Sequence, residues 1–238
     1  MYLENLVEVH SHILPGIDDG APDVETSLKM IELLKNQGAK KIVLTPHYYS
    51  DNISLDDFLR KRYLSFNLLL SKLPPQSPEL YPAAEVYISK YLFNAESLDE
   101  LKIANSDYIL IEHSFSANFD GEDYNRLINM YCDYGVKPIL AHIERYPALL
   151  EDTYKIEQYV DMGCLIQSNV SAFSDAPRGI RRKLIKLMNA GLIHVIGSDC
   201  HNLTTRAPEY GDGIEMIIKK CSEDSVKRLI NNANILVK

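Results

Sequence analysis

The 238-residue sequence has no apolar run of membrane length, few cysteines and no excess of positive charge. Apolar residues make up 46% of the chain, but no run approaches the roughly 20 residues that a membrane-spanning helix needs. The N-terminus begins almost directly with an apolar run and lacks the basic and apolar segments of a secretory signal. We therefore expect a cytoplasmic protein without membrane insertion.

Cysteine content and charge exclude two further classes of protein. The cysteines form no C-x-x-C pair, so a disulfide framework is not expected in the cytoplasm. The formal net charge is −8, which argues against nucleic-acid binding, because proteins of that kind carry a basic face. Acidic residues gathered in a site would instead favour bound cations.

Short apolar runs alternate with amphipathic helical stretches along the chain. Ser54 lies three residues before Asp57, as in a helix N-cap, and Pro74 ends the helix expected through Leu73. Gly135, Gly163 and Gly191 each separate a helical stretch from the next apolar run. The predicted strands lie near residues 6–10, 41–46, 80–86, 108–112, 137–142, 164–169 and 193–198.

This alternation predicts a parallel α/β sheet with covering helices, either a barrel or a doubly wound sheet. A barrel is preferred because barrel sites draw on many strand ends, whereas open sheets concentrate their ligands at one switch point. No linker or repeat divides the chain, so residues 1–238 are expected to form one domain. The segments 48–54 and 114–121 are expected as longer loops on the functional face.

Histidines and carboxylates follow nearly every apolar run. Neutral imidazole with carboxylate, and hardly any thiolate, is the ligand set of a catalytic metal centre. Each residue alone is ambiguous, and singly an ordinary surface or core role is favoured, but parallel strands would gather all of them at one end of the sheet. The candidates are His10, His12, Asp19, His47, Glu85, Glu112, His142, Asp199 and His201.

Several neighbouring residues refine this prediction. Pro46 cannot continue a central ladder, so its strand is expected to end there and leave His47 on the rim. Gln167 and Asn169 could form hydrogen bonds with a bound group. His194 lies inside an apolar run and is expected to be a core residue, and His113 should point to the opposite face from Glu112.

Four stretches resemble the PHP (polymerase and histidinol phosphatase) superfamily. Within it they are similar to the manganese-dependent protein-tyrosine phosphatases of bacterial capsule and exopolysaccharide clusters, the CpsB/YwqE type. They occur in the order of that family and span most of the chain. The stretches are His10–Gly20, Thr45–His47, Ala141–Tyr146, and Ser198–Asn202 with Arg206.

The resemblance implies a distorted (β/α)7 TIM-like barrel with up to three divalent metal ions at the carboxyl ends of its strands. It places His10, His12, Glu85 and Asp199 around one ion. Glu85 would bridge to a second ion, held also by Glu112 and His142, while Asp19, His47 and His201 would hold a third. Mn²⁺ is the expected metal, although Fe, Zn or Co suit the same donors. The implied partner is a phosphotyrosyl protein, a bacterial tyrosine kinase that regulates polysaccharide export.

The sequence departs from this family at several positions without losing a ligand. Glu8 stands where an Asp is usual, and Ser11 replaces a common Cys. His113 and Ser114 replace the usual Phe-Pro after the strand that ends at Glu112. That last change lies near the expected substrate mouth, so it bears on substrate preference.

Clustered cations would lower the pKa of a bridging water, so that hydroxide attacks the phosphate ester. By the resemblance, Arg145 and Arg206 correspond to the phosphate-binding arginines, and they would clamp the remaining oxygens through forked hydrogen bonds. A tyrosyl leaving group, with a pKa of about 10, needs less help from a general acid than an alkyl alkoxide.

Four alternatives compete with this hypothesis. Cys200 to Arg206 fits the C-x5-R pattern of cysteine-dependent tyrosine phosphatases, but no glycine lies between them and a chance match is favoured. The same metals would also serve a small-molecule phosphatase, such as one that acts on histidinol phosphate. A non-catalytic metal-stabilised module would not require the two arginines, and a nuclease would need a basic surface. The sequence does not determine the oligomeric state.

Overall fold

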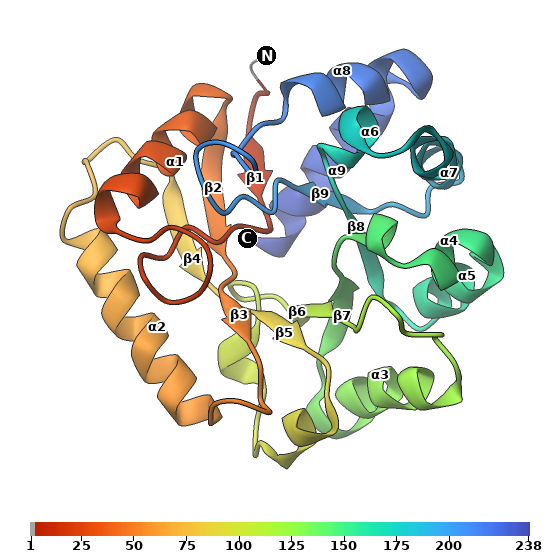
Figure 1. Ribbon diagram of the computed structural model, residues 1–238, viewed down its shortest axis with the longest axis horizontal. Helices are drawn as coiled ribbons and strands as arrows, with labels where there is room; N and C mark the ends of the chain where they lie inside the picture. Colours follow the sequence, from red (N-terminus) through yellow and green to blue (C-terminus); the bar gives the residue numbers. More distant parts are fainter. Residues whose placement is uncertain (1–2) are drawn as a thin grey trace.

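The computed structural model describes residues 3–238 and shows a ring of parallel strands surrounded by helices (Figure 1). One sheet has the order β1-β2-β4, and the other has the order β3-β5-β6-β7-β8-β9. The first sheet contains β1 (Leu6–Glu8), β2 (Ala39–Leu44) and β4 (Glu79–Pro82). The second contains β3 (His47–Tyr48), β5 (Glu85–Tyr87), β6 (Tyr108–Glu112), β7 (Lys137–Leu140), β8 (Leu165–Asn169) and β9 (Val195–Gly197).

The two sheets are parts of one curled parallel sheet. β2 and β3 are the halves of a strand broken at Thr45-Pro46, and β4 and β5 are the halves of the next one. The amide of Glu85 donates to the carbonyl of Pro46 across this break. A parallel bridge between Ser11 and Cys200 then joins the end of β1 to the end of β9. The predicted distorted barrel is confirmed, but the strand near 41–46 resumes after Pro46, which places His47 within β3.

Helices cover the outside of this sheet (Figure 1). They are α1 (Val24–Asn36), α2 (Leu55–Leu70), α3 (Gly121–Tyr134), α4 (Pro147–Glu151), α5 (Thr153–Asp161), α6 (Ala172–Asp175), α7 (Arg178–Asn189), α8 (Gly211–Lys220) and α9 (Glu223–Leu236). Short 3-10 turns occupy Lys90–Asn94, Asp99–Leu101 and Ile143–Arg145. None of the helices within residues 3–238 has both the length and the apolar character needed to cross a membrane.

The ends of the helices follow the chemistry of their terminal residues. Ser54 Oγ accepts a hydrogen bond from the amide of Asp57, 3.2 Å away, which confirms the predicted N-cap of α2. That helix ends at Leu70, three residues before the predicted Leu73. Gly135 ends α3 with φ of 64°, a left-handed conformation that glycine adopts without steric cost.

Alternate strand residues fill two separate apolar clusters. Ile109 and Ile111 of β6 pack in the larger cluster with the covering helices, whereas Leu110 belongs to a second cluster. That second cluster also contains Val7, Val43, Ile139 and Val195 from four other strands, together with Leu236 and Val237 at the end of α9. Because side chains alternate along a strand, these residues fill the inside of the barrel. The interior below the carboxyl ends of the strands is therefore apolar.

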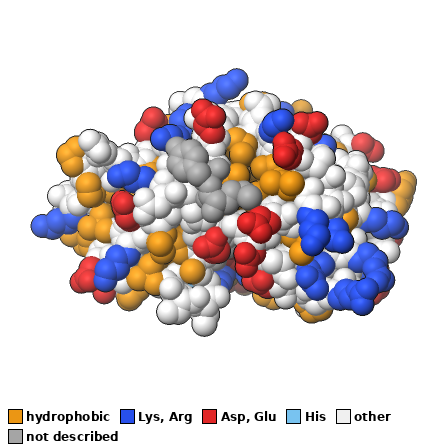
Figure 2. All heavy atoms as spheres, turned by 90° about the horizontal axis from the view of Figure 1, so that it is seen from above, with side chains coloured by type: hydrophobic (Ala, Val, Ile, Leu, Met, Phe, Trp, Pro, Cys, Tyr) orange, Lys and Arg blue, Asp and Glu red, His pale blue; other side chains and the backbone are white. Residues whose placement is uncertain are grey.

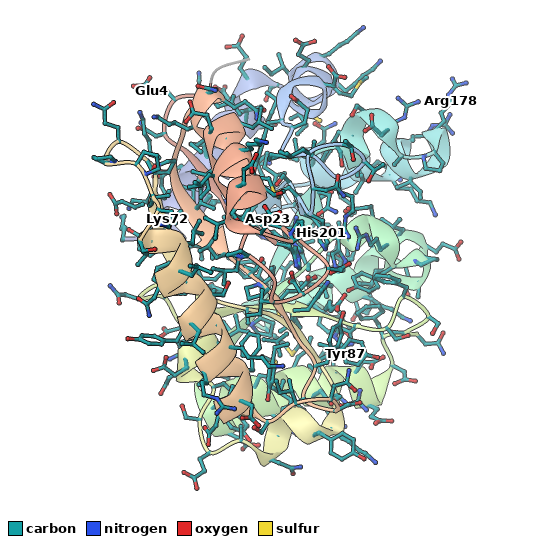
Figure 3. All side chains as sticks on the ribbon, turned by 60° about the vertical axis from the view of Figure 1, so that its left-hand side comes forward. Glu4, Asp23, Lys72, Tyr87, Arg178 and His201 are labelled. Atoms are coloured by element: carbon teal, nitrogen blue, oxygen red, sulfur yellow. The ribbon has the colours of Figure 1, made fainter. Side chains whose placement is uncertain are left out.

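The negative net charge is not spread evenly over the surface. The α7 helix carries Arg178, Arg181, Arg182, Lys183 and Lys186 without one acidic residue. Figure 2 shows Lys and Arg side chains gathered at the end of the molecule where α7 lies. Figure 3 shows Arg178 at the outer edge of the molecule, while His201 lies inside the ring of helices.

Candidate metal centre

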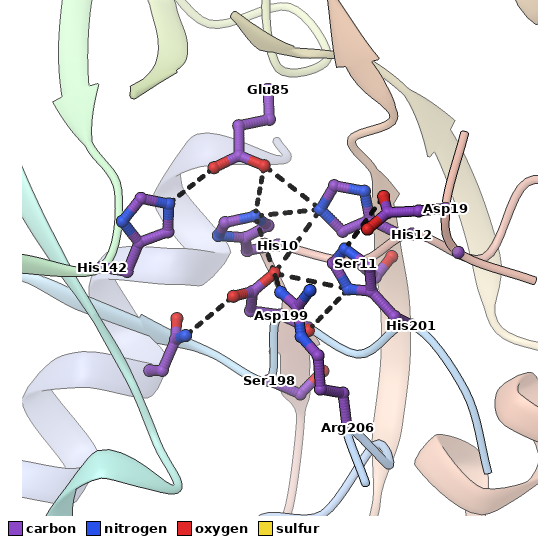
Figure 4. Close-up of polar contacts among 12 residues, drawn as sticks. His10, Ser11, His12, Asp19, Glu85, His142, Ser198, Asp199, His201 and Arg206 are labelled. Atoms are coloured by element: carbon purple, nitrogen blue, oxygen red, sulfur yellow. Dashed lines mark hydrogen bonds and ion pairs between the residues drawn. The ribbon is translucent and has the colours of Figure 1, made fainter. Parts of the chain in front are cut away.

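All nine predicted ligands lie together where the strands end, and Figure 4 shows most of them around Glu85 and Asp199. The ligand atoms form three overlapping groups. Within each group, the atoms lie within 4.8 Å of one another. The first is His10, His12, Glu85 and Asp199, the second is His12, Asp19, His47 and His201, and the third is His47, Glu85 and Glu112. His142 adjoins the third group, with Nε2 2.8 Å from Glu85 Oε1 and 3.7 Å from Glu112 Oε2.

The spacing within the first group suits a bound cation. The Nε2 atoms of His10 and His12 lie 3.3 Å apart. Glu85 Oε2 lies 3.1 and 3.2 Å from these two nitrogens, and Asp199 Oδ1 lies 3.4 and 3.5 Å from them. Four ligands about 2.1 Å from a tetrahedral metal stand about 3.4 Å apart, so these donors converge on one point as metal ligands do.

The second group is more open to solvent. Asp19 Oδ1 lies 3.6 Å from His47 Nε2 and 3.5 Å from His201 Nε2. The Asp19 side chain is 67% exposed, whereas that of His201 is 2% exposed. This group borders a groove of about 720 Å³ that continues along the first turns of α2. A cation held here would be reached from the groove.

Several ligand atoms are buried without a hydrogen-bond partner. They include Glu85 Oε2, His47 Nδ1 and His201 Nε2. Burying polar atoms without partners is costly, and cations at these points would satisfy them. The donor set and its spacing therefore fit divalent metals.

The pKa values of these groups also favour cation binding. Burial alone would raise the pKa of Glu85, but the imidazoles of His10, His12 and His142 outweigh burial and lower it well below its usual value. Burial, and then the charge of Glu85, raises the pKa of Glu112 to about 7. The carboxylates of Glu85 and Glu112 repel each other, and a cation between them would relieve that repulsion.

Two of the proposed ligands have left-handed backbone conformations. His142 has φ of 35° and Asp199 has φ of 54°, and they come shortly after the ends of β7 and β9. Non-glycine residues rarely adopt such values, at a cost of about 1–3 kcal/mol each. Sequence patterns carry no signal for this strain. The left-handed conformation sets the direction of the His142 and Asp199 side chains at the strand ends, where the ligands gather.

Both predicted phosphate-binding arginines lie at the edge of the cluster. Arg145 Nη2 is 2.6 Å from Asp199 Oδ2, and Arg206 Nη2 is 2.7 Å from Asp199 Oδ1. The side chains of both arginines are about one-third exposed and border a polar pocket of about 370 Å³. A phosphate that enters this pocket would meet both of them.

Four residues outside the predicted ligand set orient the ligands. Asp18 Oδ2 lies 2.8 Å from His12 Nδ1 and accepts a hydrogen bond from the His47 amide. Gln167 Oε1 accepts from the His142 amide at 2.5 Å, and Asn169 Nδ2 donates to Asp199 at 2.9 Å. Tyr49 donates its hydroxyl hydrogen to Glu112 Oε1 at 3.0 Å. Such partners hold metal ligands in place, and the adjacent Asp18-Asp19 pair is the sequence signal that could have identified Asp18.

Glu8 supports the ligands through the backbone. It is fully buried and accepts hydrogen bonds from the amides of His10 and Ser198 and from the hydroxyl of Tyr210. Those bonds tie the end of β1 to the end of β9. Glu8 belongs to none of the three ligand groups.

Two of the remaining predictions concern histidines outside the site. His113 is buried, with Nδ1 3.7 Å from Asp123 Oδ1, and points away from Glu112 as expected. His194 Nδ1 accepts a hydrogen bond from the Ile166 amide, but the residue is only half-buried, so it does not lie in the core as expected.

The structure also bears on the cysteine alternative. Cys200 is fully buried, and burial, with the nearby Glu8 charge, raises the pKa of its thiol well above the usual value. A thiolate nucleophile is not favoured at that position.

Several known proteins are similar to this chain. Tyrosine-protein phosphatase CpsB of Streptococcus agalactiae is 27% identical over 241 aligned positions, which cover 98% of both chains. Tyrosine-protein phosphatase YwqE of Bacillus subtilis is 26% identical over 246 positions, covering 98% of this chain and 92% of its own.

Two solved structures share the fold. One, from a study of YwqE from Bacillus subtilis and CpsB from Streptococcus pneumoniae as metal-dependent tyrosine phosphatases, superposes with a TM-score of 0.80 at 24% identity. It covers 98% of this chain and 94% of its own. A phosphotriesterase homology protein from Escherichia coli, with phosphate in its active site, has a TM-score of 0.56 at 13% identity and covers 98% of each chain. Finally, the model of the family described as "Capsular polysaccharide synthesis, CpsB/CapC" matches residues 6–238, so the chain belongs to the CpsB/CapC family.

Proposed function

We propose that this protein is a metal-dependent phosphomonoesterase that hydrolyses phosphotyrosine on protein. The observation that carries the proposal is the cluster of five imidazoles and four carboxylates with two arginines at its edge. Metals bound among these side chains and arginines aimed at the same opening suit attack on a phosphate ester. Relatives similar over nearly the whole chain carry the name tyrosine-protein phosphatase, which supports this proposal.

The ligand set suits up to three divalent ions, and we propose Mn²⁺, with Fe, Zn or Co as substitutes. We assign His10, His12, Glu85 and Asp199 to one ion. Asp19, His47 and His201 are assigned to a second, and Glu85, Glu112 and His142 to a third. When bound, such ions act as Lewis acids on phosphoryl oxygens and lower the pKa of coordinated water.

Arg145 and Arg206 bind and orient the phosphate in this proposal. Each now pairs with Asp199, and each borders the polar pocket. A guanidinium group presents parallel N–H donors that match two phosphoryl oxygens, so the two arginines would hold the ester with its bond to tyrosine facing outward. The tyrosyl oxygen leaves readily because its pKa of about 10 is low for an alcohol.

We propose a bacterial tyrosine autokinase of capsule or exopolysaccharide synthesis as the substrate, because the family is described by capsular polysaccharide synthesis. Such a substrate would place the reaction in the cytoplasm. We also propose that residues 1–238 act as one domain, since strands from β1 to β9 build a single ring.

A phosphatase assay with purified protein tests the function. The protein should hydrolyse a phosphotyrosyl peptide when Mn²⁺ is added and lose this activity when a chelator removes the metal. Histidinol phosphate should react far more slowly. Faster turnover of histidinol phosphate would favour the small-molecule alternative, and inactivity on every ester would favour a non-catalytic module.

Two variants test the assigned residues. His142→Ala and Arg206→Ala should each nearly abolish turnover. The first removes a proposed metal ligand, and the second removes a donor to the phosphoryl transition state, which costs about a hundredfold or more. Both variants should keep the circular dichroism spectrum and cooperative unfolding of the wild type. Full activity in either one would refute the role assigned to that residue.

A further inference from the structure

An exposed phenylalanine stands directly beside the candidate metal centre. Phe115 lies in the loop between β6 and α3, and half of its side chain surface is exposed. The other five phenylalanines of the chain are buried or half-buried. Singly exposed apolar side chains are ordinary, so the place of this ring beside the site, and not its exposure alone, points to a binding role.

Phe115 contacts residues assigned to the metal and to the phosphate. Its ring centroid lies 5.7 Å from that of His142, in an edge-on arrangement. The Arg145 guanidinium carbon lies 5.6 Å from the centre of the Phe115 ring. The exposed ring surface is therefore next to the place where a phosphate ester would react.

The loop that carries Phe115 is anchored on both sides of the ring. Before it, the Ser114 carbonyl accepts a hydrogen bond from the Ala117 amide at 2.9 Å. After it, Phe119 is buried against the rings of His113 and Tyr146, at 4.9 and 5.0 Å. These contacts anchor the loop, which lowers the entropic cost of placing Phe115 at the mouth.

A second aromatic group lies at the same end of the sheet, next to β3, which is two strands away from β6. Tyr49 follows β3, donates to Glu112, and has its ring 5.6 Å from that of Tyr87. Glu112 and His142, 3.7 Å apart, thus lie between Tyr49 on one side and Phe115 on the other. Aromatic side chains therefore flank both members of this Glu112–His142 pair.

We propose that Phe115, opposed by Tyr49, forms a binding site for the phenyl ring of the phosphotyrosyl substrate. This inference rests on the proposed function and assigns Phe115 a specificity role instead of a catalytic one. Aromatic rings pack edge-on or offset against one another with a gain beyond simple burial, which an alkyl phosphate cannot obtain. The site therefore favours aryl over alkyl phosphate esters. His113, buried behind the loop, supports Phe115 and does not contact the substrate.

The test compares two peptides that differ only in the phosphorylated residue. In Phe115→Ala, kcat/KM for the phosphotyrosyl peptide should fall about tenfold, mostly through KM, because ring contacts bind substrate and transition state alike. The value for the matching phosphoseryl peptide should change less than about twofold. Phe115→Tyr should restore the wild-type preference. Tyr131→Ala, which removes an exposed ring from the last turns of α3, should change neither value.

A binding measurement separates this inference from the proposed function. Phenylphosphonate and methylphosphonate are titrated calorimetrically into the Mn²⁺-loaded wild type and Phe115→Ala. The wild type should prefer the phenyl compound, and the variant should lose about tenfold of that preference. An equal loss for both probes would mean that Phe115 acts through Arg145, and no loss would mean that the ring binds elsewhere. Either result overturns the inference, even if phosphatase activity is confirmed.

Discussion

Asp199 is the residue on which the site depends most. One oxygen faces the nitrogens of His10 and His12, and both oxygens pair with arginines. Its left-handed backbone conformation is stabilised by the bond from its amide to the His10 carbonyl. A single carboxylate thus connects the proposed metal and phosphate sites, and its position depends on the join between β1 and β9.

The buried thiol of Cys200 gives a prediction at the same scale. Cys200→Ser should keep most phosphatase activity, because a buried thiol with a raised pKa is not a nucleophile. Activity should remain sensitive to chelators and insensitive to thiol-alkylating reagents. Complete loss of turnover in a variant that still folds would instead support the cysteine mechanism.

Glu144 gives a pH-dependent prediction. Part of the residue reaches the surface, but its carboxyl group is enclosed beside Ser168 and the Asn169 amide, and burial raises its pKa to about 7. Below about pH 4.5 the group is protonated in both states. As the pH rises to about 7, the unfolded state loses its proton first, so the folded state loses stability.

Glu144→Gln removes this titration. The difference in unfolding free energy, variant minus wild type, should increase by about 1–3 kcal/mol between pH 4.5 and 8. A pKa shift of one unit corresponds to about 1.36 kcal/mol. Urea unfolding of the chelator-treated proteins measures the change. Glu151→Gln, at an exposed position, is the matched control. A difference that stays constant with pH would contradict the prediction.

At the scale of elements, the broken strands decide where the ligands lie. The breaks at Thr45-Pro46 and Ala83-Ala84 separate β2 from β3 and β4 from β5. The short second halves carry His47 and Glu85, which pair with each other in register. Pro46 has no amide hydrogen to donate to a neighbouring strand, so the sequence favours a break at this point.

Replacing two helical glycines with alanine should have opposite effects on stability. A Cβ at Gly213 in α8 would lie 2.1 Å from the Val170 carbonyl oxygen, whereas a Cβ at Gly179 in α7 would have no atom within 4 Å. Gly213→Ala should destabilise the protein by about 1–3 kcal/mol through overpacking. Gly179→Ala should stabilise it by about 0.5–1 kcal/mol, because alanine favours helix. Thermal unfolding of both variants measures this difference, and similar shifts would contradict the close packing of α8.

At the scale of the whole molecule, metal binding and folding are coupled. The ligands come from strands between β1 and β9, so only the folded chain brings them together. At a Mn²⁺ concentration a hundred times its Kd, each site should stabilise the fold by about 2.7 kcal/mol. Each occupied site should then raise the Tm by about 5–10 °C.

Calorimetric scans with and without chelator measure this shift. Ca²⁺ is the control, because it prefers all-oxygen sites and binds imidazole poorly. The Mn²⁺ shift should be smaller in His12→Ala, since His12 belongs to two of the ligand groups. Equal shifts with Ca²⁺ and Mn²⁺ would indicate nonspecific charge screening instead of a metal site.

The alternation of apolar runs and helices, and the histidines and carboxylates that follow those runs, determined the parallel fold and the ligand candidates. These signals are local, since strand and helix periodicities and turn residues act over a few positions. The tertiary structure decided the distances within each ligand group, that Asp18 orients His12 while Asp19 faces the groove, and that Phe115 lies beside Arg145. Those relations depend on how the ring closes and on side-chain directions, and no local pattern encodes either.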